Sequence, residues 1–286
     1  MNNSDKTGLI LEGGGTRGVF TAGVLDYFME QDLELPYVIG VSAGACNAVN
    51  YVAHQHGRTK KCMIDYLREG SYSGLKYLIK NHSLFDMDLI FDVFPNSEIP
   101  FDYKTYFTSD KTCVLTTTNC QNGKAVYIEE KKSKKRLMAA CKASCSLPLV
   151  STMVKIDDIP MMDGGMADSI PIKKALKDGC NKAVIVLTRN KGYIKKVTPK
   201  TNRVSRIVYR DYPYLVRAII NRPEKYNKTI EYIEKLEAAG KVYVIRPEIP
   251  VVSQAETNPD ILLNFYNHGY ELAERIYSEL MEYLEK

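Results

Sequence analysis

The sequence predicts an α/β domain built on a mostly parallel sheet, with a helical C-terminal extension. Short apolar strands alternate with helical stretches through the first half of the chain. The first two strands, 8–11 and 37–39, each lead into a glycine-containing loop that opens a helix. A later strand, 183–187, is apolar throughout, as is typical of a strand that is covered on both faces of a parallel sheet.

Size and composition are those of an ordinary globular protein. The 286 residues can bury a substantial core, and 45% of them are hydrophobic and 26% charged. The net charge of +5 permits contact with an anionic surface without predicting one. Seven cysteines without a C-x-x-C pair are expected to be reduced thiols, and neither a signal peptide nor a membrane-spanning run stands out. We therefore expect a cytoplasmic protein without a nucleic-acid partner, and peripheral membrane contact stays open.

The first strand leads into a glycine-rich loop and then a helix, a combination that presents backbone N–H groups to an anion. The spacing Gly13-x-Gly15-x-x-Gly18 also fits the dinucleotide-binding fingerprint, which requires an acidic residue about 20 positions further on. No Asp or Glu occurs from 35 to 64, which opposes that interpretation. The same N–H groups suit the oxyanion of an acyl intermediate. Arg17 either adds positive charge to this loop or is an ordinary surface arginine.

The second strand leads into Gly40-Val41-Ser42-Ala43-Gly44 and then into a helix that ends near residue 53. A G-x-S-x-G motif between a strand and a helix is a nucleophile elbow, which exposes the serine hydroxyl at the carboxyl end of the strand. The alternative is a small-residue turn that lets a helix pack on a sheet. The strand before the motif and the helix after it favour the chemical interpretation.

A helix is expected at 59–68, and the stretch 71–100 that follows is apolar but has no regular period. We expect short helices there that line an acyl-chain pocket or form a lid, with ordinary core packing as the alternative for any single residue.

Strands at 112–118 and 125–128 flank Asn122-Gly123, which marks a hairpin turn. The charged run 129–136 opens a helix and is expected to be a solvated face.

The sequence Asp163-Gly164-Gly165 follows an extended apolar pair and predicts a tight turn that carries a carboxylate at a strand end. Taken alone, it also fits a plain turn. From residue 190 onward helices dominate, with helices expected at 204–221, 224–239 and 259–284 and a final strand at 242–245. We expect that strand to complete the sheet.

The three motifs, in this order, resemble those of the patatin-like phospholipase family. They are Gly13-Gly14-Gly15-Thr16-Arg17-Gly18, Gly40-Val41-Ser42-Ala43-Gly44 and Asp163-Gly164-Gly165. The chain looks most like bacterial members of about this length that carry a helical C-terminal extension. The resemblance implies a three-layer α/β/α fold, akin to the catalytic domain of cytosolic phospholipase A2. It also implies a catalytic domain at 7–190 and a mainly helical extension at 191–286 that packs on the same domain.

The resemblance further implies a Ser–Asp dyad that hydrolyses acyl esters of lipids through an acyl-enzyme intermediate. By position, Ser42 matches the nucleophile and Asp163 the base. The oxyanion loop and its basic residue match Gly13, Gly14, Gly15 and Arg17. The glycines that support the three motifs are Gly18, Gly40, Gly44, Gly164 and Gly165. The expected partner is a lipid or another acyl ester, and no cofactor or metal is expected.

The residues alone leave the identity of the base open. A serine hydroxyl needs a base to take its proton, and that base is ordinarily a histidine. His54 and His56 lie 12 and 14 residues beyond Ser42, which is roughly 18 Å or more along a helix. His82 and His268 belong to no recognisable motif. Asp163 is therefore preferred on the resemblance and not on spacing.

Other functions use or mimic the same motifs. A thioesterase or an acyltransferase would need the same serine, base and oxyanion loop. A non-catalytic module that binds acyl lipids would keep the fold, but it would be free to lose one of the motifs. A nucleotide-binding protein is suggested by the glycine spacing and opposed by the missing acidic residue.

Overall fold

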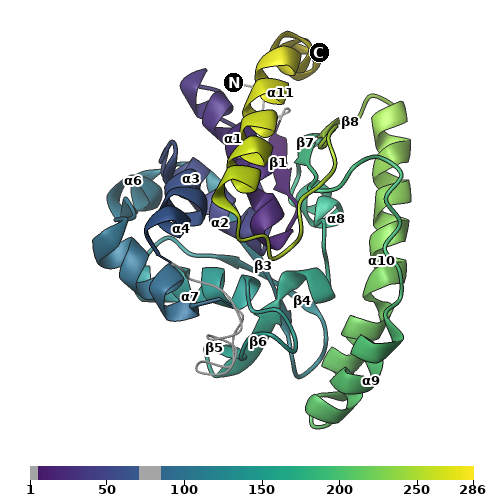
Figure 1. Cartoon of the computed structure of the whole chain (residues 1–286). Coiled ribbons are helices and arrows are strands. Elements are labelled where there is room, and N and C mark those ends of the chain that lie inside the picture. Colours follow the sequence, from purple (N-terminus) through teal and green to yellow (C-terminus); the bar gives the residue numbers. More distant parts are fainter. Residues whose placement is uncertain (1–5, 71–84) are drawn as a thin grey trace.

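An eight-stranded sheet runs through the part of the chain that the computed structural model describes, residues 6–70 and 85–286 (Figure 1). Its strand order is β5-β6-β3-β2-β1-β7-β8, and β4 pairs with β3. The strands β3, β2, β1, β7 and β8 run parallel to their neighbours in that order, whereas β4, β5 and β6 are antiparallel. Helices cover both faces, so the predicted three-layer α/β/α fold with a mostly parallel sheet is confirmed.

The elements follow one another in the order that the sequence predicts. The strands are β1 (Thr7–Leu11), β2 (Tyr37–Val41), β3 (Thr112–Asn119), β4 (Ala125–Glu129), β5 (Val154–Ile156), β6 (Ile159–Asp163), β7 (Lys182–Val186) and β8 (Val242–Ile245). The longer helices are α1 (Gly18–Glu30), α2 (Ala43–Val52), α7 (Lys134–Ser144), α9 (Pro199–Val208), α10 (Pro213–Ala238) and α11 (Pro259–Glu285). The other helical segments are η1 (Gly15–Arg17), α3 (Arg58–Lys60), η2 (Lys61–Asp65), α4 (Tyr66–Glu69), η3 (Leu89–Glu98), α6 (Tyr103–Thr108), η4 (Gly164–Met166) and α8 (Ile172–Lys177).

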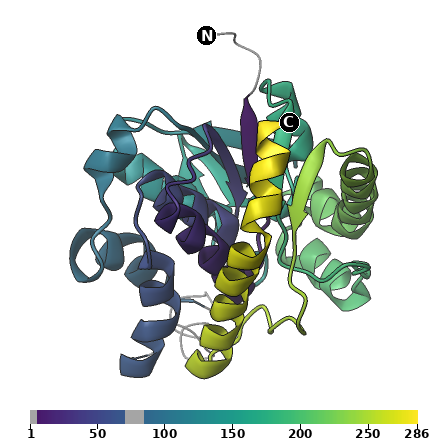
Figure 2. The ribbon, with the colours of Figure 1, turned by 90° about the horizontal axis from the view of Figure 1, so that it is seen from above.

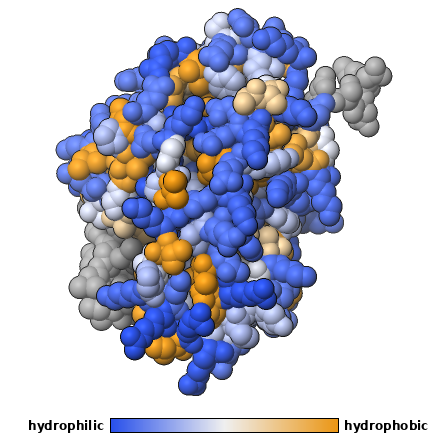
Figure 3. All heavy atoms as spheres, turned by 90° about the vertical axis from the view of Figure 1, so that its right-hand side faces the viewer, coloured by the Kyte–Doolittle hydropathy of each residue, from blue (hydrophilic) through white to orange (hydrophobic). Residues whose placement is uncertain are grey.

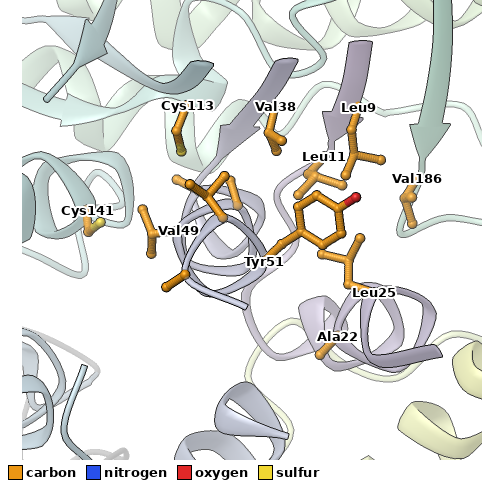
Figure 4. Close-up of a cluster of buried hydrophobic side chains, with 14 of the residues drawn as sticks. Leu9, Leu11, Ala22, Leu25, Val38, Val49, Tyr51, Cys113, Cys141 and Val186 are labelled. Carbon is orange, nitrogen blue, oxygen red and sulfur yellow. The ribbon is translucent and has the colours of Figure 1, made fainter. Parts of the chain in front are cut away.

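Alternating side chains of the central strands bind the two helical layers to the sheet. On β1, Leu9 and Leu11 face the layer of α1, α2, α7 and α11, while Ile10 faces the layer of α8 and α10. Figure 4 shows the first of these interfaces, where strand residues such as Leu9 and Val38 point toward helix residues such as Val49. Each such side chain is fully or almost fully buried, which contributes about 1.5–3 kcal/mol per residue.

The C-terminal part of the chain is built into the same body. Strand β8 extends the sheet by pairing in parallel with β7, which confirms the predicted final strand. Helix α11 lies across α1 on one face of the sheet, and α10 packs on the other (Figure 2). The Asn258 side chain caps α11 by accepting hydrogen bonds from the N–H groups of Asp260 and Ile261.

The break between the two helices after residue 198 differs from the prediction. The sequence suggested helices at 204–221 and 224–239, separated at Pro223, but α9 ends at Val208 and α10 runs from Pro213 to Ala238. Pro213 fits the first position of a helix, where its missing N–H is not needed. Pro223 lies inside α10, at the cost of one backbone hydrogen bond. The buried apolar face of this 26-residue helix outweighs that cost.

The stretch 71–100, predicted to form short helices that line an acyl-chain pocket or form a lid, lies only partly within the described residues. Residues 71–84 lie outside the described residues, and 89–98 form the π-helical segment η3. The predicted hairpin is confirmed, since β3 and β4 pair in antiparallel register on either side of Asn122-Gly123. The helix expected at 59–68 is present as the consecutive segments α3, η2 and α4.

The close crossing of α1 and α11 predicts that replacing Gly269 of α11 by alanine lowers the stability of the protein. A Cβ at Gly269 would lie 2.1 Å from the Phe20 carbonyl oxygen. In an ordinary helix interior, Gly→Ala stabilises by up to about 1 kcal/mol. Here Gly269→Ala should instead destabilise by about 1–3 kcal/mol, because the helices must separate. Urea unfolding measures this, and Ser278→Ala at an exposed position of α11 is the control. A stabilised Gly269→Ala protein would contradict the close crossing.

Candidate active site

Ser42 occupies a sharp turn between the end of β2 and the start of α2. Its backbone angles, φ 55° and ψ −126°, are rare for residues other than glycine and cost about 1–3 kcal/mol. The flanking glycines let the helix lie against the strand, because a Cβ at Gly40 would lie 2.2 Å from the Gly44 carbonyl oxygen. The turn therefore holds the side chain of Ser42 at the carboxyl end of β2.

A second serine, absent from the motifs, fixes this turn. Ser144, at the end of α7, accepts a hydrogen bond of 2.8 Å from the Ser42 N–H. Its hydroxyl in turn donates to the Thr116 carbonyl oxygen on β3 at 2.7 Å. Ser144 is fully buried. Sequence reasoning missed it because it lies 102 residues from Ser42 and carries no pattern of its own.

Asp163 is the last residue of β6 and is 1% exposed. Its Oδ1 accepts a hydrogen bond of 2.7 Å from the Gly165 N–H, and Oδ2 has no hydrogen-bond partner among the described residues. Burial raises the pKa of the Asp163 carboxyl. The positive charge of Arg222, the Ser42 hydroxyl and the Gly165 N–H oppose that rise. Ser42 and Asp163, the two residues of the predicted dyad, line the same pocket.

The glycine loop lies against Ser42. A Cβ at Gly13 would lie 2.9 Å from the Ser42 Cβ, so only glycine fits beside the turn. The N–H groups of Gly13 and Gly14 donate to no acceptor in residues 6–70 and 85–286. Gly15 begins η1, and Arg17 ends it. Free N–H groups beside a serine hydroxyl are the arrangement that an oxyanion needs.

Arg17 is a buried residue of this loop and not a surface arginine. It is 5% exposed, and its Nε has no hydrogen-bond partner among the described residues. Burial and the neighbouring Arg189 lower the pKa of Arg17 to about 10, which leaves it charged at neutral pH. Of the remaining motif glycines, Gly18 begins α1, and Gly164 and Gly165 form the turn η4 after Asp163.

None of the histidines that the structure describes lines either pocket that contains Ser42. His56 pairs with Glu30 at 2.8 Å, and His54 lies 3.7 Å from Glu34. His268 accepts a hydrogen bond from the Glu248 N–H. His82 lies outside the described residues. Within the described ranges, no group of three or more histidine, cysteine or acidic residues could hold a metal ion.

Two pockets meet at Ser42. The first is named here the apolar pocket, because most of the side chains that line it are apolar. Its lining includes Phe85, Met87, Ile90 and Phe91, which belong to the aperiodic stretch, but not Phe94, which is fully buried in a separate cluster. An alkyl chain that starts at Ser42 would thus meet an apolar wall.

The second pocket, named here the cationic pocket, contains Ser42 and Asp163 together with several basic residues. These are Arg17, Arg189, Lys195 and Arg222. The last three also line an outer chamber that continues from it. Sequence reasoning missed these three, because nothing distinguishes them from the many lysines and arginines between 189 and 222.

Residues 9–176 match the family described as patatin-like phospholipase, and residues 212–285 match a domain of unknown function, DUF6363. The chain is 27% identical to the uncharacterized protein YjjU of Escherichia coli (strain K12) over 255 residues, which are 86% of this chain and 70% of YjjU. Among solved structures it is similar to VipD from Legionella pneumophila, with a TM-score of 0.47 and 11% identity, over 98% of this chain and 67% of VipD.

The environment of Asp163 predicts how Ser42 reactivity depends on pH. If Asp163 accepts the Ser42 proton, labelling of Ser42 by a fluorophosphonate requires the ionised carboxylate. Because burial raises this pKa, labelling should fall with decreasing pH through a midpoint above the ordinary aspartate value of about 3.9. Arg222→Gln removes a charge that lowers the pKa, so its midpoint should move to higher pH.

The matched control is Lys228→Gln, an exposed cation on the same helix that pairs with Glu224. Its midpoint should equal that of the wild type. An unchanged midpoint in Arg222→Gln would remove Asp163 from the role of base.

Proposed function

The chain belongs to the patatin-like phospholipase family, and on this premise we propose that it hydrolyses acyl esters of lipids through an acyl-Ser42 intermediate. One observation carries the proposal. Ser42, a buried carboxylate with a free oxygen and unpaired loop N–H groups converge where the apolar and cationic pockets meet. We take 7–190 as the catalytic domain and 191–286 as its extension.

In the proposed reaction, Asp163 accepts the proton of the Ser42 hydroxyl while Oγ attacks the ester carbonyl carbon. The N–H groups of Gly13 and Gly14 stabilise the oxyanion that forms. The intermediate collapses, and the leaving alcohol takes the proton from Asp163. Water then attacks the acyl carbonyl carbon and gives a proton to Asp163. When this second intermediate collapses, the Ser42 Oγ takes that proton from Asp163 and the carboxylic acid is released.

The surroundings of Asp163 support its role as a base. An aspartate with an ordinary pKa is a weak base at neutral pH, and burial shifts Asp163 in the useful direction. Its unpaired Oδ2 is the oxygen available to a proton donor. Arg17 supplies positive charge near the developing oxyanion and remains buried with the loop.

A surface beside the outer chamber suits contact with a lipid interface. Thr201 and Asn202 of α9 line that chamber. Large apolar side chains are exposed on α9 and on the segment before it: Ile194, Val197, Ile207 and Val208. Exposed cations accompany them: Lys196, Lys200, Arg203 and Arg206. Figure 3 shows this face as mainly hydrophilic, with apolar patches scattered over it, several of them toward its lower end. Such a combination favours an anionic membrane surface. No helix in the described ranges is long and apolar enough to cross a bilayer.

The dyad is tested with a panel of p-nitrophenyl esters and phospholipids. Ser42→Ala should abolish turnover, and Asp163→Asn should lower it by about 100- to 10,000-fold, since general-base catalysis contributes that much. Asp168→Asn should have a milder effect, because Asp168 accepts a hydrogen bond from Tyr127 outside the pocket.

A variant with all four histidines changed to Gln should retain most of the activity. Loss of turnover in a folded single-histidine variant would replace the Ser–Asp dyad with a Ser–His pair.

The acyl-chain preference should depend on Phe91 and not on Phe94. Phe91 lines the apolar pocket, whereas Phe94 packs beside Cys62 and Ile99 in a separate cluster. Both alanine variants should lower stability, by up to about 3–5 kcal/mol. Only Phe91→Ala should shift the ratio of kcat/KM between long and short acyl esters. Equal ratios in both variants would locate the acyl-chain site elsewhere.

A further inference from the structure

We propose that the cationic pocket, together with the outer chamber that continues from it, is a subsite for a phosphomonoester. The substrates would then be acyl esters whose alcohol part carries a terminal phosphate, in preference to neutral or zwitterionic lipids. This inference rests on the proposed function and names the substrate class of the same site. Three of its four cations lie outside the residues that match the patatin-like family.

Four basic side chains enter this pocket without a carboxylate partner. Arg17, Arg189, Lys195 and Arg222 line it together with Ser42 and Asp163, and none of the four forms an ion pair within the described part of the chain. The buried Nε atoms of Arg17 and Arg222 have no hydrogen-bond partner there either. A buried N–H of a guanidinium group that has no acceptor is costly, and an anionic ligand would relieve that cost.

Aromatic rings hold two of these cations in place. The Lys195 Nζ lies 4.6 Å from the centroid of the Tyr226 ring, and the Arg189 Cζ lies 4.2 Å from that of Tyr193. The backbone of Lys195 is fixed as well, since its N–H donates to Asn227 and its carbonyl oxygen accepts from the same side chain. Cations that are positioned before a ligand arrives lose little entropy on binding.

The balance of charge in the pocket points to a dianion. Glu12 and Asp163 are the acidic residues that line the cationic pocket, so with every group ionised its four basic residues leave an excess of two positive charges. The Glu12 carboxylate is already occupied by hydrogen bonds from Thr188 and Tyr226. A phosphomonoester near neutral pH carries close to two negative charges, which matches this excess.

The outer chamber disfavours zwitterionic headgroups. None of its lining residues in the described ranges is acidic, so an ammonium group would find no carboxylate there. Burial, Arg222, Arg189 and Arg17 lower the pKa of Lys195 to about 7, despite the opposing charge of Glu12. A bound phosphate would supply negative charge beside Lys195 and the three arginines, which form no ion pair within the described residues.

The geometry relates this subsite to the scissile ester. Ser42 and Leu147 line both the apolar and the cationic pocket. An ester whose acyl chain fills the apolar pocket therefore directs its alcohol part toward Arg17 and Arg222. The phosphate would be bound on the leaving-group side of the reacting carbonyl.

The first experiment compares kcat/KM for a lysophosphatidic acid, the lysophosphatidylcholine and the monoacylglycerol with the same acyl chain, below their micellar concentrations. The wild type should prefer lysophosphatidic acid by at least tenfold. Lys195→Gln and Arg222→Gln should each lower that preference about tenfold, the size expected for a lost charged hydrogen bond. Lys228→Gln, whose side chain is exposed on α10, should leave it unchanged. Any effect of Arg222 on Asp163 cancels in the ratio of kcat/KM values, because all three substrates use the same base.

The second experiment measures binding without turnover. Calorimetry should detect binding of glycerol 3-phosphate to the Ser42→Ala variant. The double variant that also carries Arg222→Gln should bind glycerol 3-phosphate more weakly. Inorganic phosphate should bind less tightly than glycerol 3-phosphate. Equal affinities would mean a site for free phosphate and would overturn the substrate assignment.

The two proposals fail in different ways. Ser42-dependent hydrolysis of the monoacylglycerol without preference for lysophosphatidic acid would overturn the phosphate subsite alone. Absence of Ser42-dependent hydrolysis of every ester would overturn the proposed function. In that case, failure of glycerol 3-phosphate to bind would overturn the subsite as well.

Discussion

The close packing of α2 against β2 is the constraint on which the site depends. Backbone atoms meet where a Cβ at Gly40 would lie 2.2 Å from the Gly44 carbonyl oxygen, and one at Gly44 would lie 2.3 Å from that of Leu11. This contact forces Ser42 into its strained conformation, and the bond from its N–H to Ser144 holds it there. Because β2 lies between β1 and β3, the same contact sets Ser42 beside the glycine loop that follows β1 and the Asp163 turn held against β3.

The second half of the chain completes the site and does not merely cover the fold. Tyr226 reaches from α10 to Glu12, at the start of the glycine loop, with a hydrogen bond of 2.9 Å. Lys195 and Arg222 enter the pocket from the same half. The residues that match the patatin-like family thus carry the predicted reacting groups, while most of the charge around them comes from beyond that match.

Much of the fold could be predicted because it follows local rules. The strands around Leu9 and Val184 are continuous apolar runs, which predict buried strands. The dipeptide Asn122-Gly123 predicts the turn of the hairpin formed by β3 and β4. The sequence did not predict the position of the break between α9 and α10, because both Pro213 and Pro223 are able to interrupt a helix. Only the packing of α10 determines that Pro213 begins this helix and that Pro223 lies inside it. Ser144 and Arg222 could not be predicted, because they approach Ser42 and Asp163 only after long-range packing.

The hydrogen bond between Tyr226 and Glu12 has a consequence for moving residues 9–176, the part that matches the family, into another protein. Glu12 also accepts from the N–H and the hydroxyl of Thr188, so a single carboxylate joins the glycine loop, the end of β7 and α10. A chimera that transplanted residues 9–176 alone would leave that carboxylate without Thr188 and Tyr226, its hydrogen-bond donors. Residues 9–176 therefore depend on the rest of the chain for their packing, and the end of the family match is not the end of a structural unit.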